Sequence, residues 1–376
     1  MTESPLRLWM VVALACLVSP DRLAAAEEAS PGESRISRIE SLLDGVTFMG
    51  DLRLRYEGIF DDTALANNRG RFRLRLGFSK KIGDIALVTV RGATGSSNDP
   101  TSTNQSFEDN FTPKTFHISL AYASIHPWPW LDLQGGKMPV PFAKTDLVWD
   151  DDLTPEGLSQ QIVHRHARGK WFFRMAELFF HTSAAAEDGY LIGYQAGFTH
   201  EFSVKTRLTI APAYTQVVRP NRTLAVGSNG NMTTSAGAAL ASQFRVINVP
   251  VRWETAVSAE RPLVIDIDLA KNQGAAAVAG KTYDQGFLIE MALGRAKTKG
   301  DWMARYRYAR IESDAVLSAF NDSDFGFTNV KGHRIAFDFV PVDVLKLTAA
   351  SIFTDPVISG SRPARARVQF DASFAF

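Results

Sequence analysis

The sequence predicts an all-β protein, a closed antiparallel transmembrane β-barrel of about sixteen strands. Three observations support this fold class. Polar and apolar side chains alternate with a period of two along most of the chain, and that period is typical of β-strands. Short turns between these stretches alternate with long polar loops, as they do in outer-membrane barrels. Past the N-terminus, no run of about 18 apolar residues offers a spanning helix.

The N-terminus differs from the rest of the chain. Arg7 precedes an apolar stretch at 8–18, and Ala24, Ala25 and Ala26 supply small residues before Glu27. This pattern predicts a secretory signal peptide at 1–26 that is cleaved, because the apolar stretch is short for an uncleaved anchor. The only cysteine, Cys16, lies inside it, so the mature chain has no disulfide. A lipoprotein signal at Cys16 is the alternative, although the apolar run continues past it.

Residues 27–45 are predicted to be a periplasmic segment with a short amphipathic helix. Its apolar residues, such as Ile36, Ile39 and Leu43, recur at helical spacing. The helix is compatible with a cap on its own barrel and with a contact between subunits. A homotrimer and a monomer therefore both stay open, and the barrel is expected at 46–376.

The strands follow from the alternation and the turns from polar residues between them. The first strand is predicted at 46–57 and the second at 69–78. Within 158–181, the alternation of polar and apolar residues is hard to follow. Further strands are predicted at 190–200, 205–215, 263–269, 287–293, 302–311, 334–340, 344–353 and 364–376. Short turns are predicted at 80–83, 126–130, 168–169, 259–260, 295–300 and 341–343. Long loops are predicted at 61–67, 95–113, 140–156, 217–239, 272–281, 313–330 and 355–363.

The arginines of the second strand determine which face of the barrel lines the water-filled lumen. Arg69, Arg71, Arg73 and Arg75 alternate with glycine, phenylalanine and leucine. Facing lipid, each would cost about 2–4 kcal/mol near the midplane, and the sum exceeds the stability of many proteins. We therefore expect them in the lumen. Closure of the barrel extends this set to a predicted pore-lining basic wall of Arg53, Arg55, Arg69, Arg71, Arg73, Arg75, Arg91, Arg365 and Arg367, with Arg305 and Arg307 farther round.

Acidic residues gather in the predicted loop at 140–156. Folded inward, this loop would narrow the pore and set carboxylates opposite the arginines, although a solvated outer loop is also compatible with its composition. A calcium site is a third interpretation, but the spacing of the acidic residues in this loop lacks the EF-hand pattern. The candidate constriction residues are Asp146, Asp150, Asp151, Asp152 and Glu156.

Other kinds of site find little support in the sequence. The net charge of +1 gives no global basic bias toward nucleic acid. His164 and His166 lack a third metal ligand, and there is no GxSxG nucleophile elbow. We therefore predict no catalytic residue, no metal and no cofactor.

Several stretches resemble the bacterial outer-membrane "Putative porin" family. They are GDLRLRYE from Gly50, RGRFRLRLGF from Arg69, ATGSSNDPTSTNQSFEDNF from Ala93, GGKMPVPF from Gly135 and TDLVWDDDLTPEGL from Thr145. Phe374 and the terminal Phe376 resemble the aromatic end that outer-membrane barrels present to their assembly machinery. The resemblance implies a passive, water-filled channel in the outer membrane for small hydrophilic solutes or ions.

The leading functional hypothesis is therefore a porin whose arginine wall favours anions. An outer-membrane barrel enzyme of the lipase kind is the first alternative, but it needs an outward-facing Ser/His pair, and none stands out. A secreted β-sheet binding protein is the second alternative.

Overall fold

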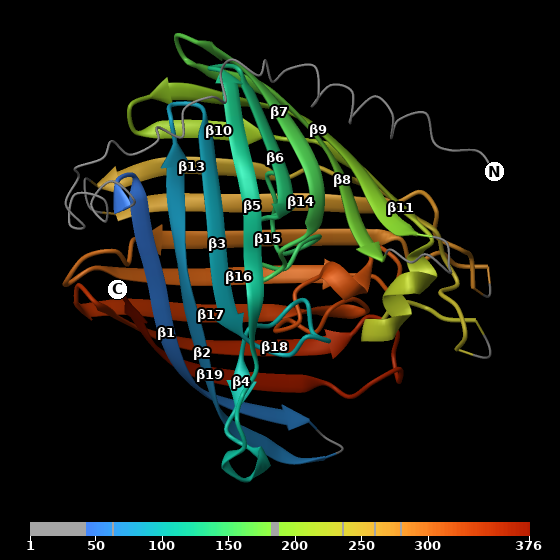
Figure 1. Ribbon diagram of the computed structural model, residues 1–376. Helices are drawn as coiled ribbons and strands as arrows, with labels where there is room; N and C mark the ends of the chain where they lie inside the picture. The colour runs from blue at the N-terminus through green and yellow to red at the C-terminus, as the bar shows by residue number, and fades with distance from the viewer. Residues whose placement is uncertain (1–42, 62–63, 182–187, 235–236, 259–260, 279) are drawn as a thin grey trace.

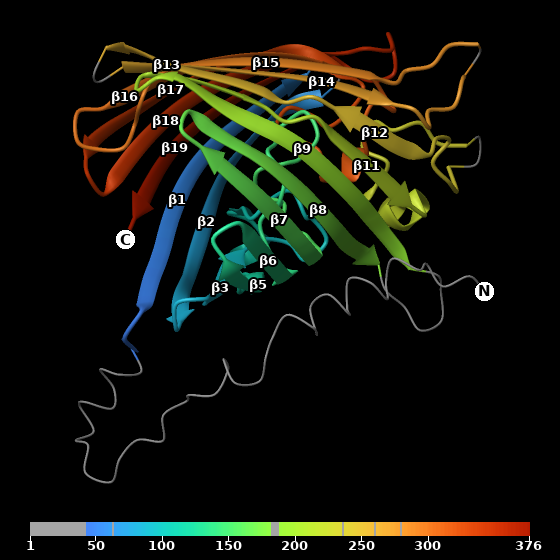
Figure 2. The same cartoon turned by 90° about the horizontal axis from the view of Figure 1, so that it is seen from above.

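The strands of this chain close into a single ring. The computed structural model describes residues 43–61, 64–181, 188–234, 237–258, 261–278 and 280–376. Within them, 19 antiparallel strands form one continuous sheet (Figure 1). Seen from above, the sheet encloses the inward loops (Figure 2). In the described residues, no helix has both the length and the apolar character needed to traverse a membrane.

The bounds of the elements follow the alternation in the sequence. The strands are β1 (Val46–Asp61), β2 (Ala64–Ile82), β3 (Ala86–Thr94), β4 (Gln105–Ser106), β5 (Phe116–Trp128), β6 (Leu131–Lys137), β7 (Glu156–His166), β8 (Gly169–His181), β9 (Gly189–Ser203), β10 (Thr206–Ile210), β11 (Ala213–Val218), β12 (Phe244–Asn248), β13 (Val251–Ser258), β14 (Arg261–Asn272), β15 (Gln285–Gly294), β16 (Trp302–Ile311), β17 (Val330–Val342), β18 (Leu345–Pro356) and β19 (Arg365–Ala375). Short 3₁₀ turns are η2 (Asp109–Phe111), η3 (Pro220–Val226) and η4 (Ser318–Phe320).

The 19 strands occupy sixteen positions in the barrel, which confirms the predicted fold class. β4 is only a two-residue pairing on the edge of β2. β10 and β11 both pair with β9, so they are two halves of one strand that is interrupted before Ala213. β12 and β13 both pair with β14 and are halves of the next strand. Both interruptions contain a proline, Pro212 and Pro250, which lacks the N–H that a central strand needs.

The ring closes where β19 meets β1. Their register runs from Asp51 opposite Ala375 to Asp61 opposite Arg365. At its end, the Gly50 N–H donates to the Phe376 carbonyl at 2.9 Å, and the Phe376 N–H donates to the Gly50 carbonyl at 3.1 Å. Closure leaves no open edge in this sheet, which is the condition for a sheet in lipid.

The two faces of each strand differ as the alternation predicts. On β1, Phe48, Leu54 and Tyr56 are exposed on the outer surface, while Arg55 and Glu57 are buried on the inner face. A closed barrel has only these two faces. The structure therefore places the apolar set outside and the charged set inside.

Two expectations about individual segments need correction or completion. The predicted long loop at 61–67 is wrong, because β1 extends to Asp61 and β2 already begins at Ala64. The difficult stretch at 158–181 is part of a regular hairpin of β7 and β8. The predicted signal peptide at 1–26 lies outside the described residues, as does all but the end of the predicted segment at 27–45.

Two long loops fold into the barrel and pack there through an apolar core. One connects β6 to β7, and the other connects β16 to β17. Their buried residues are Met138, Phe142, Leu147, Val148, Trp149 and Leu153 in the first, with Ala315, Val316, Leu317, Ala319 and Phe325 in the second. They contact inner side chains of β8, β9, β12 and β14 to β16, such as Leu178, Phe244 and Leu288. The apolar filling leaves the arginine-bearing side of the lumen to polar groups.

Deleting Phe376 tests the role of the last residue in closing the ring. The deletion removes the two hydrogen bonds to Gly50 at about 0.5–1.5 kcal/mol each. We expect a lower temperature for the heat-induced mobility shift of the refolded barrel in gel electrophoresis. The matched control Phe376→Leu keeps both backbone bonds and an apolar side chain, so it should shift much less. Equal shifts in the two variants would contradict this role for the backbone pairing.

Candidate functional site

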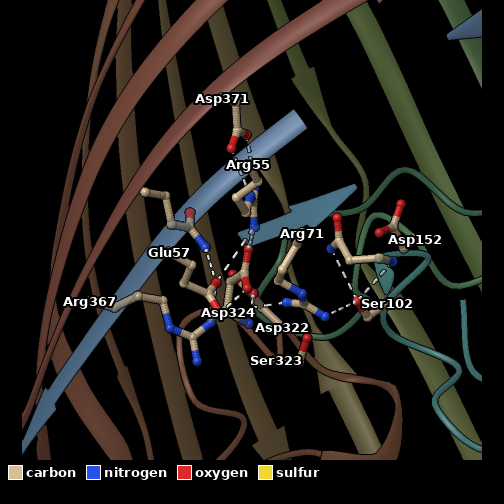
Figure 3. Close-up of polar contacts among 12 residues, drawn as sticks. Arg55, Glu57, Arg71, Ser102, Asp152, Asp322, Ser323, Asp324, Arg367 and Asp371 are labelled. Carbon is tan, nitrogen blue, oxygen red and sulfur yellow. Dashed lines mark hydrogen bonds and ion pairs between the residues drawn. The ribbon is translucent and has the colours of Figure 1, made fainter. Parts of the chain in front are cut away.

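The inner faces of β1, β2 and β19 form a wall of arginines interleaved with carboxylates (Figure 3). Arg55 binds Asp371 of β19 at 2.7 Å, and it also binds Asp324 of the β16–β17 loop at 3.0 Å. Arg367 binds the other oxygen of Asp324 at 2.6 Å. Glu57, with a fully buried side chain, accepts hydrogen bonds from two neighbours, Arg69 at 2.7 Å and Gln369 at 2.9 Å. The wall is therefore a lattice of ion pairs.

The remaining arginines of the predicted wall have fewer acidic partners. Asp51 bridges Arg73 at 2.7 Å and Arg75 at 2.6 Å. The other contacts are mostly with neutral groups: Arg53 donates to Asn104 at 2.7 Å, Arg71 to Ser102 at 3.4 Å and Arg91 to Ser119 at 2.9 Å. Arg365 shares the inner face of β19 with Arg367 by strand alternation.

The predicted constriction loop folds inward between β6 and β7, but only part of its acidic set faces the predicted wall. Asp152 lies 3.9 Å from both Arg73 and Arg75. Asp146 instead pairs with Arg307 of β16, which lies outside the predicted arginine wall. Asp151 is 84% exposed and pairs with Lys144 of its own loop at 2.6 Å.

Glu156 does not belong to the loop. It is the first residue of β7, and it lies 3.1 Å from Lys137 of β6 in an exposed pair. Strand pairing therefore continues farther than the loop composition indicated.

The β16–β17 loop supplies a second acidic set that the sequence did not single out. Arg307 of β16 joins the two loops to the barrel strands. It binds Asp146 of one loop, Asp322 of the other at 2.9 Å and Glu290 of β15 at 2.6 Å. The loops also bind each other, because the Ser323 N–H donates to Asp150 at 3.2 Å. Acidic residues in a long polar loop were visible in the sequence, but nothing local indicated that this loop turns inward.

A third segment, between β3 and β4, completes the inward cluster. Thr103 donates to Asp152 through both its amide, at 3.4 Å, and its hydroxyl, at 3.3 Å. Ser323 donates to the Thr101 carbonyl at 3.3 Å. Three loops that are far apart in sequence are thus tied together inside the ring.

Between the wall and the loops lies a cavity of about 400 Å³. One side is basic and the other is acidic, so the two sides impose a field across it. Its basic lining is Arg53, Arg55, Arg73, Arg75 and Arg334, and its acidic lining is Asp146, Asp150, Asp151, Asp152, Asp322 and Asp324. Thr101, Ser102, Asn104 and Ser323 complete it.

The loop carboxylates fall into two electrostatic classes. Burial, together with the nearby Asp322 and Asp152, raises the pKa of Asp150. Burial and the charge of Asp146 likewise raise the pKa of Asp322. For Asp324, burial opposes ionisation, but Arg55 and Arg367 hold its pKa well below the usual range. Asp324, which is bound to the arginine wall, therefore loses its proton readily, whereas Asp150 and Asp322 retain theirs more strongly.

Comparison with known proteins agrees with this architecture. Residues 59–221 and 215–344 match the family model described as "Putative porin", which together is more than half of the chain. The chain belongs to this family. No curated protein matches it at the level of sequence.

Three solved structures of bacterial outer-membrane proteins are similar to this porin, and the first of them shows the shared fold. OprB of Pseudomonas putida, in its high-pH structure, superimposes with a TM-score of 0.59 at 15% identity, over 93% of this chain and 100% of that one. OpdQ of Pseudomonas aeruginosa gives 0.49 at 9% identity, over 88% and 98%. A triple mutant of the Rhodopseudomonas blastica porin gives 0.48 at 8%, over 88% and 100%. Family and fold together identify a porin-type barrel of the bacterial outer membrane.

Replacing Arg307 tests whether this arginine holds the loops in place. Arg307→Met leaves Asp146, Glu290 and Asp322 without their shared cation, and breaking a buried pair costs about 3–5 kcal/mol. We expect the loops to detach and the single-channel current to become larger and noisier in planar bilayers.

Arg305→Met is the matched control for this test. Arg305 also faces inward from β16, but its ion pair is with Asp338 of the neighbouring strand at 2.9 Å. This variant should keep the wild-type conductance. A wild-type conductance for Arg307→Met would show that the loops do not depend on Arg307.

Raising the pH tests the protonated contact at Asp150. Because the pKa of Asp150 is raised in the folded protein, the folded state binds the proton more tightly than the unfolded state. Stability of the loop contact therefore falls as pH rises from about 4 toward the raised value. We expect current fluctuations to increase between pH 5 and pH 9, and Asp150→Asn to abolish most of that increase. The exposed neighbour variant Asp151→Asn should leave the increase intact, and an unchanged increase in Asp150→Asn would refute the assignment.

Proposed function

We propose that this porin is a passive channel for small hydrophilic solutes and ions and that it prefers anions. The observation that carries the preference is the excess of arginine on one arc of the lumen. The nine arginines of the predicted wall share the inner faces of β1, β2, β3 and β19 with only four acidic residues, Asp51, Glu57, Asp61 and Asp371. The arc therefore keeps net positive charge after its own carboxylates are counted.

The loops reduce this excess, because they add acidic side chains to the same cavity. Asp152 and Asp324 bring carboxylates close to the arginines. Asp150 holds its proton more strongly than usual because it is buried near other acids, which raise its pKa, so it contributes less negative charge. Arg334 adds a further cation to the cavity lining.

Transport in this proposal requires no chemical step. The cavity admits small solutes by size, and the charged sides orient and select them, as in other pores lined by charged side chains. We accordingly assign no catalytic residue and no cofactor. Lipid surrounds the outer apolar faces.

Export and assembly of the barrel form a further part of the same proposal. We propose that residues 1–26 are removed on export, that 27–45 stay in the periplasm and that 46–376 form the barrel. Phe374 and Phe376 would then present the aromatic end to the assembly machinery. A homotrimer is the assembly that we propose to test by cross-linking in detergent.

Ion selectivity is tested by reversal potentials in planar bilayers under a potassium chloride gradient. We expect the sign of an anion-selective channel for the refolded mature chain. The triple variant Arg71→Gln, Arg73→Gln and Arg75→Gln should move the reversal potential toward cation selectivity, because it removes three lumen charges. Clear cation selectivity of the unaltered chain would overturn the anion preference, and the absence of any conductance would overturn the channel itself.

A triple variant at the short turns is the matched control. Arg168, Lys205 and Lys299 lie in connections between strands, and replacing them with glutamine removes the same charge away from the cavity. Mobile ions screen such charges within about 3 Å at 1 M salt. The control should therefore leave the reversal potential close to that of the unaltered chain.

A further inference from the structure

A row of polar side chains crosses four neighbouring strands near the base of the β6–β7 loop. Asp132 of β6 lies opposite Gln161 of β7, Gln161 opposite Arg174 of β8, and Arg174 opposite Gln195 of β9. Residues directly opposite each other in antiparallel strands project to the same face. The row is on the inner face, because Gln195 hydrogen-bonds Ala143 of the β6–β7 loop, which folds into the barrel.

One end of the row holds the loop. Gln195 is 1% exposed, and it binds Ala143 twice: its side-chain oxygen accepts the Ala143 N–H at 2.7 Å, and its Nε2 donates to the Ala143 carbonyl at 2.8 Å. The loop base therefore has a fixed position above the row.

Arg174 carries a charge that no carboxylate neutralises at close range. Its Nε donates to Gln161 at 2.6 Å and its Nη1 to Gln195 at 3.2 Å. Its guanidinium carbon lies 4.6 Å from the centre of the Phe172 ring. Within the described residues, no carboxylate oxygen comes within 4.0 Å of this guanidinium. The group is held in place by neutral partners and keeps donors for a ligand.

Asp132 is the acidic counterpart at the other end of the cavity. Its two oxygens accept hydrogen bonds from Ser124 at 3.0 Å and Gln134 at 3.2 Å. His126 lies 3.5 Å away. In the part of the chain that the structure describes, no lysine or arginine lies within 4.0 Å of this carboxylate. Asp132 is thus oriented by neutral groups and by one histidine at the edge.

The two charges face one cavity of about 320 Å³. Only β7 separates their strands, so their backbones are about 10 Å apart at a strand spacing of 4.7–4.9 Å. Gln134 and Gln161 line the polar part of the cavity, and Val140 and Phe142 of the loop base line an apolar part.

We propose that this cavity is a binding subsite for small zwitterions that carry an ammonium group and a carboxylate, such as free amino acids. The carboxylate would bind Arg174, the ammonium group would bind Asp132, and the aliphatic part would pack on Phe142. The proposal rests on the channel function, since the solute must reach the lumen. A simple anion gains only one of the two charged contacts, so the site favours a molecule with both charges.

The test uses three probes of one carbon chain. 4-Aminobutyrate carries both charges, butyrate only the negative one and butylamine only the positive one. Block of the open-channel current by each probe is measured on the refolded full-length mature chain in planar bilayers. A charged hydrogen bond contributes about 1.5–3 kcal/mol, so we expect 4-aminobutyrate to bind at least about tenfold more tightly than either analogue.

Two variants remove the charges one at a time. Asp132→Asn and Arg174→Gln should each abolish the advantage of 4-aminobutyrate while the channel still conducts. Asp132 does not touch the Gln195–Ala143 pair that holds the loop. The Asp132→Asn variant therefore separates loss of ligand binding from displacement of the loop. Arg168→Gln, in the turn between β7 and β8, removes an arginine charge outside the cavity and should keep the advantage.

The outcomes separate this proposal from the channel proposal. If the unaltered chain conducts but binds all three probes equally, or if Asp132→Asn keeps the advantage, the zwitterion subsite is refuted and the channel stands. If no current is seen at all, the channel proposal is refuted, and the subsite proposal that rests on it is refuted with it. A tenfold advantage that both variants lose and Arg168→Gln keeps would support the subsite.

Discussion

The closed ring of backbone hydrogen bonds is the constraint on which the rest of this porin depends. In lipid, an unpaired backbone group costs several kilocalories per mole, so a sheet must have no open edge. The pairing of β1 with β19 meets that condition, as far as the Gly50 and Phe376 backbone. Closure also divides all side chains into an outer and an inner set. The arginines of β2 then have only the inner face available.

Concentrating arginines inside creates a second problem that the structure solves with carboxylates. Like charges on neighbouring strands repel, and partly buried guanidinium groups need acceptors. Asp51, Glu57 and Asp371 supply acceptors from the wall itself, and Asp152 and Asp324 supply them from two loops. The ion pairs that stabilise the wall therefore also draw the loops into the lumen and define the cavity.

The opposite side of the lumen is organised by apolar packing. Leu147 and Trp149 of one loop and Val316 and Phe325 of the other bury against the inner faces of the strands. This core holds the loops where their acidic residues meet the arginine wall. The polar row from Asp132 to Gln195 lies at the foot of the same loop, and Gln195 ties the loop to that row through Ala143.

The sequence by itself determined the barrel, its strand number and the inward direction of Arg69 to Arg75, because alternation and the cost of charge in lipid are local properties. The sequence predicted a basic wall, whereas the structure shows that Asp51 and Glu57 of the same strand face pair with its arginines. Only the tertiary structure decided that Asp322 and Asp324 reach the arginines and that Asp146 pairs with Arg307. The physical reason is that those contacts join segments more than 150 residues apart or depend on how two loops pack, and no local periodicity encodes such packing.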